Sequence, residues 1–224
     1  MKTIYFLMAI LFVLVFQIVD AQEQVAFKKN EVGFNIVNYS SIDIPSDPPQ
    51  PKFDISFING IYFKRHYNEN TLRLSVDQLT CNVKIHGNGS YEADTLITMG
   101  NWREQMFSMG FEQNYFEKKQ FHLYWGVDLN LYYGIYSGQS QSLSGLSNFS
   151  TVKQNKGIGL TPLAGIRFTI SNFLRISLET SGSSLFFTEF ENKKWTLPMV
   201  KNEQNQAITF ALKYNVGCKI SYLF

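Results

Sequence analysis

The feature that most constrains this chain is a two-residue alternation of apolar and polar side chains over unusually long runs. In residues 207–224 every even position carries an apolar or aromatic side chain, whereas the odd positions are mostly small or polar. The same alternation recurs in 121–138 and 158–170. Because successive side chains of a strand point to opposite faces, this period predicts long β-strands with one apolar face.

Five further segments carry weaker forms of the pattern, so the chain is predicted to be all-β with eight strands. In the third strand the apolar phase flips between Val76 and Leu79, which predicts a β-bulge near Asp77 and Gln78. After the apolar N-terminal stretch described below, no segment comes near the roughly 18 consecutive apolar residues of a membrane-spanning helix. The five segments are 31–39, 53–67, 71–85, 103–116 and 174–190.

The connections between these strands are alternately short and long. Residues 68–70, 117–120 and 171–173 are short, whereas 40–52, 87–102, 139–156 and 191–206 are long and polar. Transmembrane barrels sort their connections in this way, with tight periplasmic turns and long extracellular loops. We therefore expect an eight-stranded antiparallel up-and-down transmembrane β-barrel.

Aromatic side chains indicate which solvent surrounds the barrel. Aromatic residues make up 16% of the chain and charged residues only 17%, a balance that favours lipid over water. A soluble barrel would instead turn its apolar phase inward. A net charge of +2 without a basic cluster excludes a nucleic-acid partner. Six aromatic residues of the apolar phase lie near the predicted turns and form a predicted membrane girdle: Tyr67, Tyr115, Phe121, Phe168, Tyr222 and Phe224.

The N-terminus has the layout of a secretory signal peptide. Lys2 precedes an apolar stretch of about 16 residues, which is too short to span a bilayer. Small residues near Ala21 resemble a cleavage site. The predicted organisation is therefore a signal peptide over 1–21, a short periplasmic leader over 22–30, and an outer-membrane barrel over 31–224.

Together the leader, the eight alternating strands, the sorted connections and the final Ile220-Ser221-Tyr222-Leu223-Phe224 resemble the small outer-membrane β-barrels of Gram-negative bacteria, the OmpA/OmpX-type, porin-like group. The resemblance implies placement in the outer membrane, in contact with its lipids and lipopolysaccharide. It also implies that the barrel assembly machinery recognises the C-terminal strand during biogenesis.

The side chains on the strand face opposite to the apolar face are expected to fill the lumen, and they include charges of both signs. An eight-stranded barrel is just wide enough for side chains, so these charges are expected to pair and to exclude a wide pore. A cluster of Arg167, Glu179 and Lys219 is the most specific expectation, and a gated ion path is the alternative to a structural network. The predicted lumen network contains Asp128, Arg167, Glu179, Lys213 and Lys219, and the same phase holds Lys64, Arg73, Asp77 and Glu112.

No recognisable motif supports catalysis, a cofactor or a metal ion. His86, with Ser90 and Glu92 nearby, is the one histidine near the predicted loops, but it forms no acylase pattern. The predicted role is non-enzymatic: structural, or surface adhesion and recognition through loops whose partner the sequence leaves open. The alternatives are a narrow channel for small or apolar solutes, as in OmpW-like barrels, and a lipid-A-modifying enzyme. A ten-stranded variant, the oligomeric state and conduction through the lumen also stay open.

Overall fold

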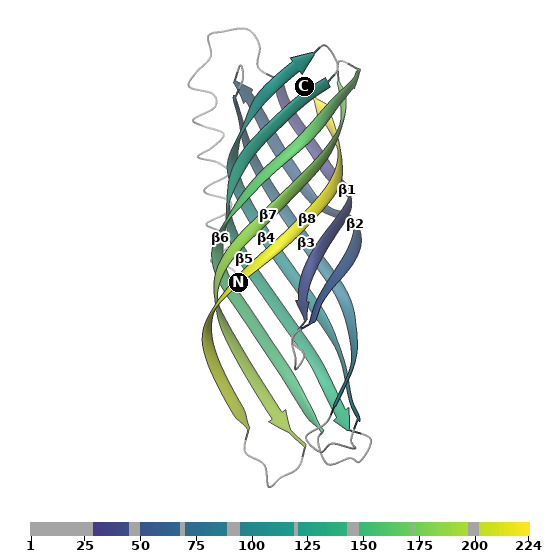
Figure 1. Cartoon of the computed structure of the whole chain (residues 1–224), viewed down its shortest axis with the longest axis vertical. Coiled ribbons are helices and arrows are strands. Elements are labelled where there is room, and N and C mark those ends of the chain that lie inside the picture. The colour runs from purple at the N-terminus through teal and green to yellow at the C-terminus, as the bar shows by residue number, and fades with distance from the viewer. Residues whose placement is uncertain are drawn as a thin grey trace.

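The computed structural model describes residues 29–44, 50–67, 70–88, 95–118, 121–142, 148–171, 173–196 and 202–224. These residues form one closed barrel of eight antiparallel strands, in which each strand pairs with its sequence neighbours and β1 pairs with β8 (Figure 1). The predicted fold class and strand number are confirmed. The strands are β1 (Lys29–Ile44), β2 (Gln50–Tyr67), β3 (Asn70–Asn88), β4 (Thr95–Lys118), β5 (Phe121–Ser142), β6 (Phe149–Ser171), β7 (Leu174–Trp195) and β8 (Glu203–Leu223).

The predicted signal peptide over 1–21 lies outside the described residues. The same is true of the predicted leader, except that Lys29 and Asn30 belong to β1. Among the described residues, no helix is long and apolar enough to cross a bilayer.

The strands are steeply tilted. Following paired residues from Asn35 on β1 through every strand leads to Thr209 on β8, whereas the direct β8 partner of Asn35 is Lys219. The barrel therefore closes with a stagger of 10 residues (219 − 209), which for eight strands corresponds to a tilt of about 35–45°. Each residue then adds roughly 2.5 Å along the barrel axis.

The two faces of the strands have opposite chemistry near the tight turns. Apolar side chains such as Leu129, Leu160 and Phe168 point outward and expose about half of their surface. Lys64, Glu112 and Arg167 point inward and are almost fully buried. A water-soluble barrel has the reverse arrangement, so this outer surface is built for contact with lipid.

The strands are longer than the sequence pattern predicted. They have 16 to 24 residues, while crossing a bilayer takes about 9–11. Much of each predicted long loop belongs to a strand, and the connections shrink to 45–49, 89–94, 143–148 and 196–202. The predicted alternation of short and long connections remains. Composition misled the loop assignment because Ser, Gly, Gln and Asn also suit a strand that has left the lipid.

The predicted β-bulge at Asp77 and Gln78 is wrong. Pairing of β3 with β4 continues without interruption from Asn70 to Asn88. Leu79 and Cys81 simply face the lumen, as their strand phase requires, whereas Gln78 faces outward and is exposed. The flip in the sequence thus marks a change of environment rather than a change of register.

Beyond the Gln78 level, the interior of the barrel holds two apolar clusters. On β3 and β4 the outward residues Thr80, Asn82 and Gln105 are exposed and polar. On β7 and β8 the outer face stays apolar further up, at Phe186, Ile208 and Phe210. The barrel therefore spans lipid at the turn end and continues as a water-exposed β-structure at the other end. One cluster contains Leu79, Cys81, Trp102 and Tyr136, and the other contains Tyr132, Leu185, Phe187 and Ala211.

The β1–β2 hairpin pairs with β3 over only part of its length. Pairing of β2 with β3 stops at Gly60 and Asp77, although β3 pairs with β4 for 11 residues more, from 78 to 88. We call the separation between residues 50–59 of β2 and 78–88 of β3 the lateral gap. It begins beside irregular pairing of both hairpin strands, where Ile58 has a positive φ of 51°. Bulges bend strands, which accounts for the departure of the hairpin from β3 (Figure 1).

Candidate functional site

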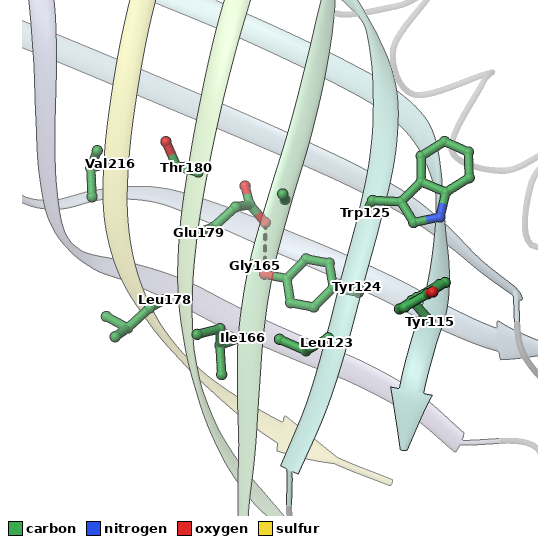
Figure 2. Close-up of a pocket in the computed structure, with 11 residues that line it drawn as sticks. Tyr115, Leu123, Tyr124, Trp125, Gly165, Ile166, Leu178, Glu179, Thr180 and Val216 are labelled. Atoms are coloured by element: carbon green, nitrogen blue, oxygen red, sulfur yellow. Dashed lines mark hydrogen bonds between the residues drawn. The ribbon is translucent and has the colours of Figure 1, made fainter. Parts of the chain in front are cut away.

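A network of buried charges fills the lumen near the middle of the lipid-facing band. Glu179 on β7 receives two hydrogen bonds from Arg73, at 2.8 and 3.1 Å, and one from Lys219 at 2.6 Å. The Tyr124 hydroxyl donates a fourth at 3.0 Å (Figure 2). A buried carboxylate is stable only when it is paired and hydrogen-bonded in this way.

Glu112 on β4 is the second carboxylate of the network. Lys64 donates to it at 2.7 Å, Arg167 donates to its other oxygen, and Arg73 lies 3.5 Å away. Arg73 also lies 3.2 Å from Asp128, so one guanidinium joins three carboxylates. These side chains come from β2 to β8 and close the lumen at this level.

Of the expected cluster, Lys219 contacts Glu179, whereas Arg167 does not pair with it. Arg167 faces Ser177 in the β6–β7 ladder and donates to Glu112 instead. Its guanidinium lies 4.5 Å from the ring centre of Tyr124, which stands between the two. Tyr124 can lie there because the neighbouring Gly165 has no side chain: a Cβ would approach the ring to 2.4 Å.

Of the other predicted network residues, Lys219 and Asp128 lie in this cluster, but Lys213 does not. Lys213 donates to Glu104 and lies 3.3 Å from the Tyr132 hydroxyl, closer to the open end of the barrel. A further group at the turn end escaped the sequence analysis: Glu31 accepts from His66 at 2.8 Å and from Arg175 at 3.2 Å. Following the inward-facing positions to the ends of the strands would have found this group.

The six aromatic residues predicted as a girdle lie at the turn end. Tyr115 is 83% exposed, and Phe121 packs against Phe168 with ring centres 5.2 Å apart. Phe173, which the prediction missed because it sits in a turn, adds a ring 5.9 Å from that of Tyr222. The remaining predicted members, Tyr67 and Phe224, are exposed at the ends of β2 and β8.

A groove of about 490 Å³ crosses the lipid-facing surface above the girdle (Figure 2). Ala164 and Gly165 contribute little bulk there, and Trp125, Leu178 and Val216 surround them. The exposed surface of the groove is mostly apolar, so the groove offers acyl chains a surface, and Tyr124 and Glu179 border it.

A second, smaller pocket of about 60 Å³ lies in the lumen beside the lateral gap. We call it the lateral pocket. Both sides of the gap contribute to it, and its lining combines apolar side chains such as Leu79 and Met106 with polar ones that are rich in acceptors. The lining includes Asn38, Asn59, Asp77, Glu104, Lys213 and Asn215.

The described segments hold no group of three or more His, Cys, Asp and Glu side chains that could ligate a metal ion. Cys81 and Cys218 do not form a disulfide. The side chain of His86, as well as Ser90 and Glu92, lies outside the described residues.

Solved structures share this architecture. A major outer-membrane protein from Thermus thermophilus superposes with a TM-score of 0.50 at 10% identity, covering 88% of this chain and 100% of that one. OprG from Pseudomonas aeruginosa gives 0.49 at 10%, covering 88% and 95%. Ail, the attachment invasion locus protein of Yersinia pestis, gives 0.42 at 12%, covering 88% and 97%.

At the level of sequence, no protein-family model and no curated protein matches the chain. The strand number and the closed up-and-down order agree with the solved barrels. The chain therefore folds as a small eight-stranded outer-membrane β-barrel of the OmpA/OmpX type.

Proposed function

We propose that this protein is a non-enzymatic outer-membrane barrel that presents its water-exposed end for adhesion or recognition at the cell surface. The observation that carries the proposal is the change of polarity along the strands. The strands β3 and β4 continue beyond the lipid-facing band with exposed polar residues such as Thr80, Asn82 and Gln105, around apolar clusters in the lumen. A rigid β-structure of this length has no use in crossing the membrane and suits binding outside it.

The closed lumen supports a role other than wide-pore transport. Arg73 lies within 3.5 Å of Glu112, Asp128 and Glu179, and this group crosses the barrel interior. In the proposed setting, the apolar band contacts membrane lipids and lipopolysaccharide, and β8 with Phe224 is recognised by the barrel assembly machinery. Signal-peptide cleavage near Ala21 is part of the same proposal.

Trimming the water-exposed end tests the proposal. Residues 139–150 of the β5–β6 hairpin are replaced by Asn-Gly, which joins Gly138 directly to its partner Thr151 through a two-residue turn. Cells that express the intact protein are expected to attach to immobilised matrix proteins or glycans, and cells with the trimmed variant to lose this attachment. A heat-modifiability gel verifies that the variant still folds as a barrel. Equal attachment by both, or none by either, contradicts the proposal.

The lateral gap favours a second candidate, a narrow route for small or apolar solutes that leaves through the wall. A cross-link between cysteines placed at Asn59 and Gln78, in a background without Cys81 and Cys218, would close the gap near its start. Solute uptake into liposomes is expected to fall after cross-linking if this route exists. Uptake that does not change excludes it.

A further inference from the structure

The lateral pocket contains buried oxygen atoms that have no hydrogen-bond partner within the described residues. They are the side-chain carbonyl oxygens of Asn38, Asn59 and Asn215 and the hydroxyl of Ser40. Asn38 is only 6% exposed. A buried acceptor without a donor costs about 1–3 kcal/mol, and several around one pocket indicate that donors are supplied from elsewhere.

The charge of the pocket has the matching sign. Asp77 lines it and receives hydrogen bonds only from two neutral side chains, from Asn35 and, at 3.3 Å, from Ser75. No ion pair of Asp77 occurs within the described part of the chain. Glu104, by contrast, is neutralised by Lys213. The lining therefore holds one carboxylate without a direct ion pair, on which the charges of Arg73 and Lys219 act from a distance, beside several acceptors that have no donor.

From this arrangement we infer that the lateral pocket binds a primary ammonium group. An ammonium has one positive charge and three N–H donors, which match the carboxylate of Asp77 and the amide oxygens around it. A divalent cation fits less well, because Ca²⁺ and Mg²⁺ sites usually gather several carboxylates and Glu104 is already paired. The volume of about 60 Å³ admits an aminoethyl group but not a whole lipid or sugar.

Two sources can present this group. The lateral gap starts at Gly60 and Asp77, where the outer face of β3 changes from the apolar Val76 to the polar Gln78, so a lipid headgroup at this boundary can reach the pocket sideways. A free amine can reach it from the water-exposed end. The inference does not depend on whether that end also binds a surface partner.

The test uses the purified full-length barrel and two probes. Ethanolamine binding is measured by calorimetry in detergent. Lipid binding is measured by native mass spectrometry after release from nanodiscs that contain either phosphatidylethanolamine or phosphatidylcholine, whose quaternary nitrogen has no N–H donor. The variants are Asp77→Asn and Asn215→Val, and Thr80→Ala is the matched control, because Thr80 is exposed on the outer face of the same strand. A heat-modifiability gel verifies folding, and Asn215→Val carries the test if Asp77→Asn does not fold.

Saturable binding of one amine per barrel is expected in the wild type and in Thr80→Ala, weakened at least about tenfold by Asp77→Asn. Ethanolamine binding without lipid retention identifies a soluble amine as the ligand, and selective retention of phosphatidylethanolamine identifies a headgroup. The inference is overturned if neither probe binds, if phosphatidylcholine is retained equally, if calcium binds in place of the amine, or if both folded variants bind like the wild type.

Discussion

Removing the carboxylate of Glu179 should strongly destabilise the barrel. Glu179→Ala takes away the acceptor of four hydrogen bonds, two from Arg73 and one each from Lys219 and Tyr124. Arg73 keeps Glu112 and Asp128 nearby, but Lys219 loses the only ion pair it forms in the described structure. Breaking a buried ion pair by removing one partner costs about 3–5 kcal/mol. A loss of about 4 kcal/mol changes the unfolding equilibrium roughly a thousandfold.

Urea unfolding in detergent, followed by the heat-modifiable gel shift, measures this loss. With a slope of about 2 kcal/mol per molar urea, the midpoint should fall by about 2 M. Glu189→Ala is the matched control on the same strand. Its carboxylate lies 2.8 Å from Lys153, but both side chains are partly exposed, so its removal should cost less than about 1 kcal/mol. Equal shifts in the two variants, or no shift in Glu179→Ala, would refute the argument that the network stabilises the barrel.

Three further expectations follow from the packing. Gly165→Ala should destabilise the barrel by about 1–3 kcal/mol in the same urea assay, because its Cβ would lie 2.4 Å from the Tyr124 ring. Gly182→Ala should be neutral, because its Cβ has no contact closer than 3.8 Å. A similar loss of stability in both variants would contradict the steric reason. Brominated lipid tails should quench the fluorescence of Trp125, which is 48% exposed on the lipid-facing surface, but not that of Trp102, which is 2% exposed in the lumen. Variants with a single tryptophan separate the two signals. Quenching of Trp102 would show that the faces are assigned wrongly. Trp102→Ala should cost about 3–5 kcal/mol in the urea assay because it empties an apolar cluster, while the quenching of Trp125 stays the same; a neutral effect would mean that this cluster is not packed.

The barrel could be predicted from the sequence because side chains alternate between the two faces of a strand both in lipid and in water. The eight strands, their order and the turn-end aromatic residues could all be read from the phase of residues such as Phe121 and Phe168. The strand ends could not, because a strand that leaves the lipid has the composition of a loop. The flip at Leu79 was misread for the same reason: a register change and a change of environment give the same pattern along one strand, and only the pairing with β4 distinguishes them.

The sequence also could not predict which charged residues pair with one another in the lumen. Phase places Arg167 and Glu179 inside, but which charges meet depends on the stagger of 10 residues and on where bulky rings stand. Tyr124 separates the pair that proximity along neighbouring strands suggested. The lateral pocket was not predicted because it depends on where β2 stops pairing with β3. The sequence marked an irregularity at Asp77, but one strand alone does not show which neighbour loses its pairing there.

The change of polarity along the strands also determines how deep the barrel sits in the bilayer. A shift of two residues toward the lipid would move Gln78 of β3 and Gln105 of β4 into the hydrocarbon. The opposite shift would expose apolar residues such as Leu129 to water. With roughly 2.5 Å of height per residue, displacements of about 5 Å are thus opposed in both directions. The water-exposed end is therefore held at a constant height above the membrane, which sets the distance at which any partner would be met.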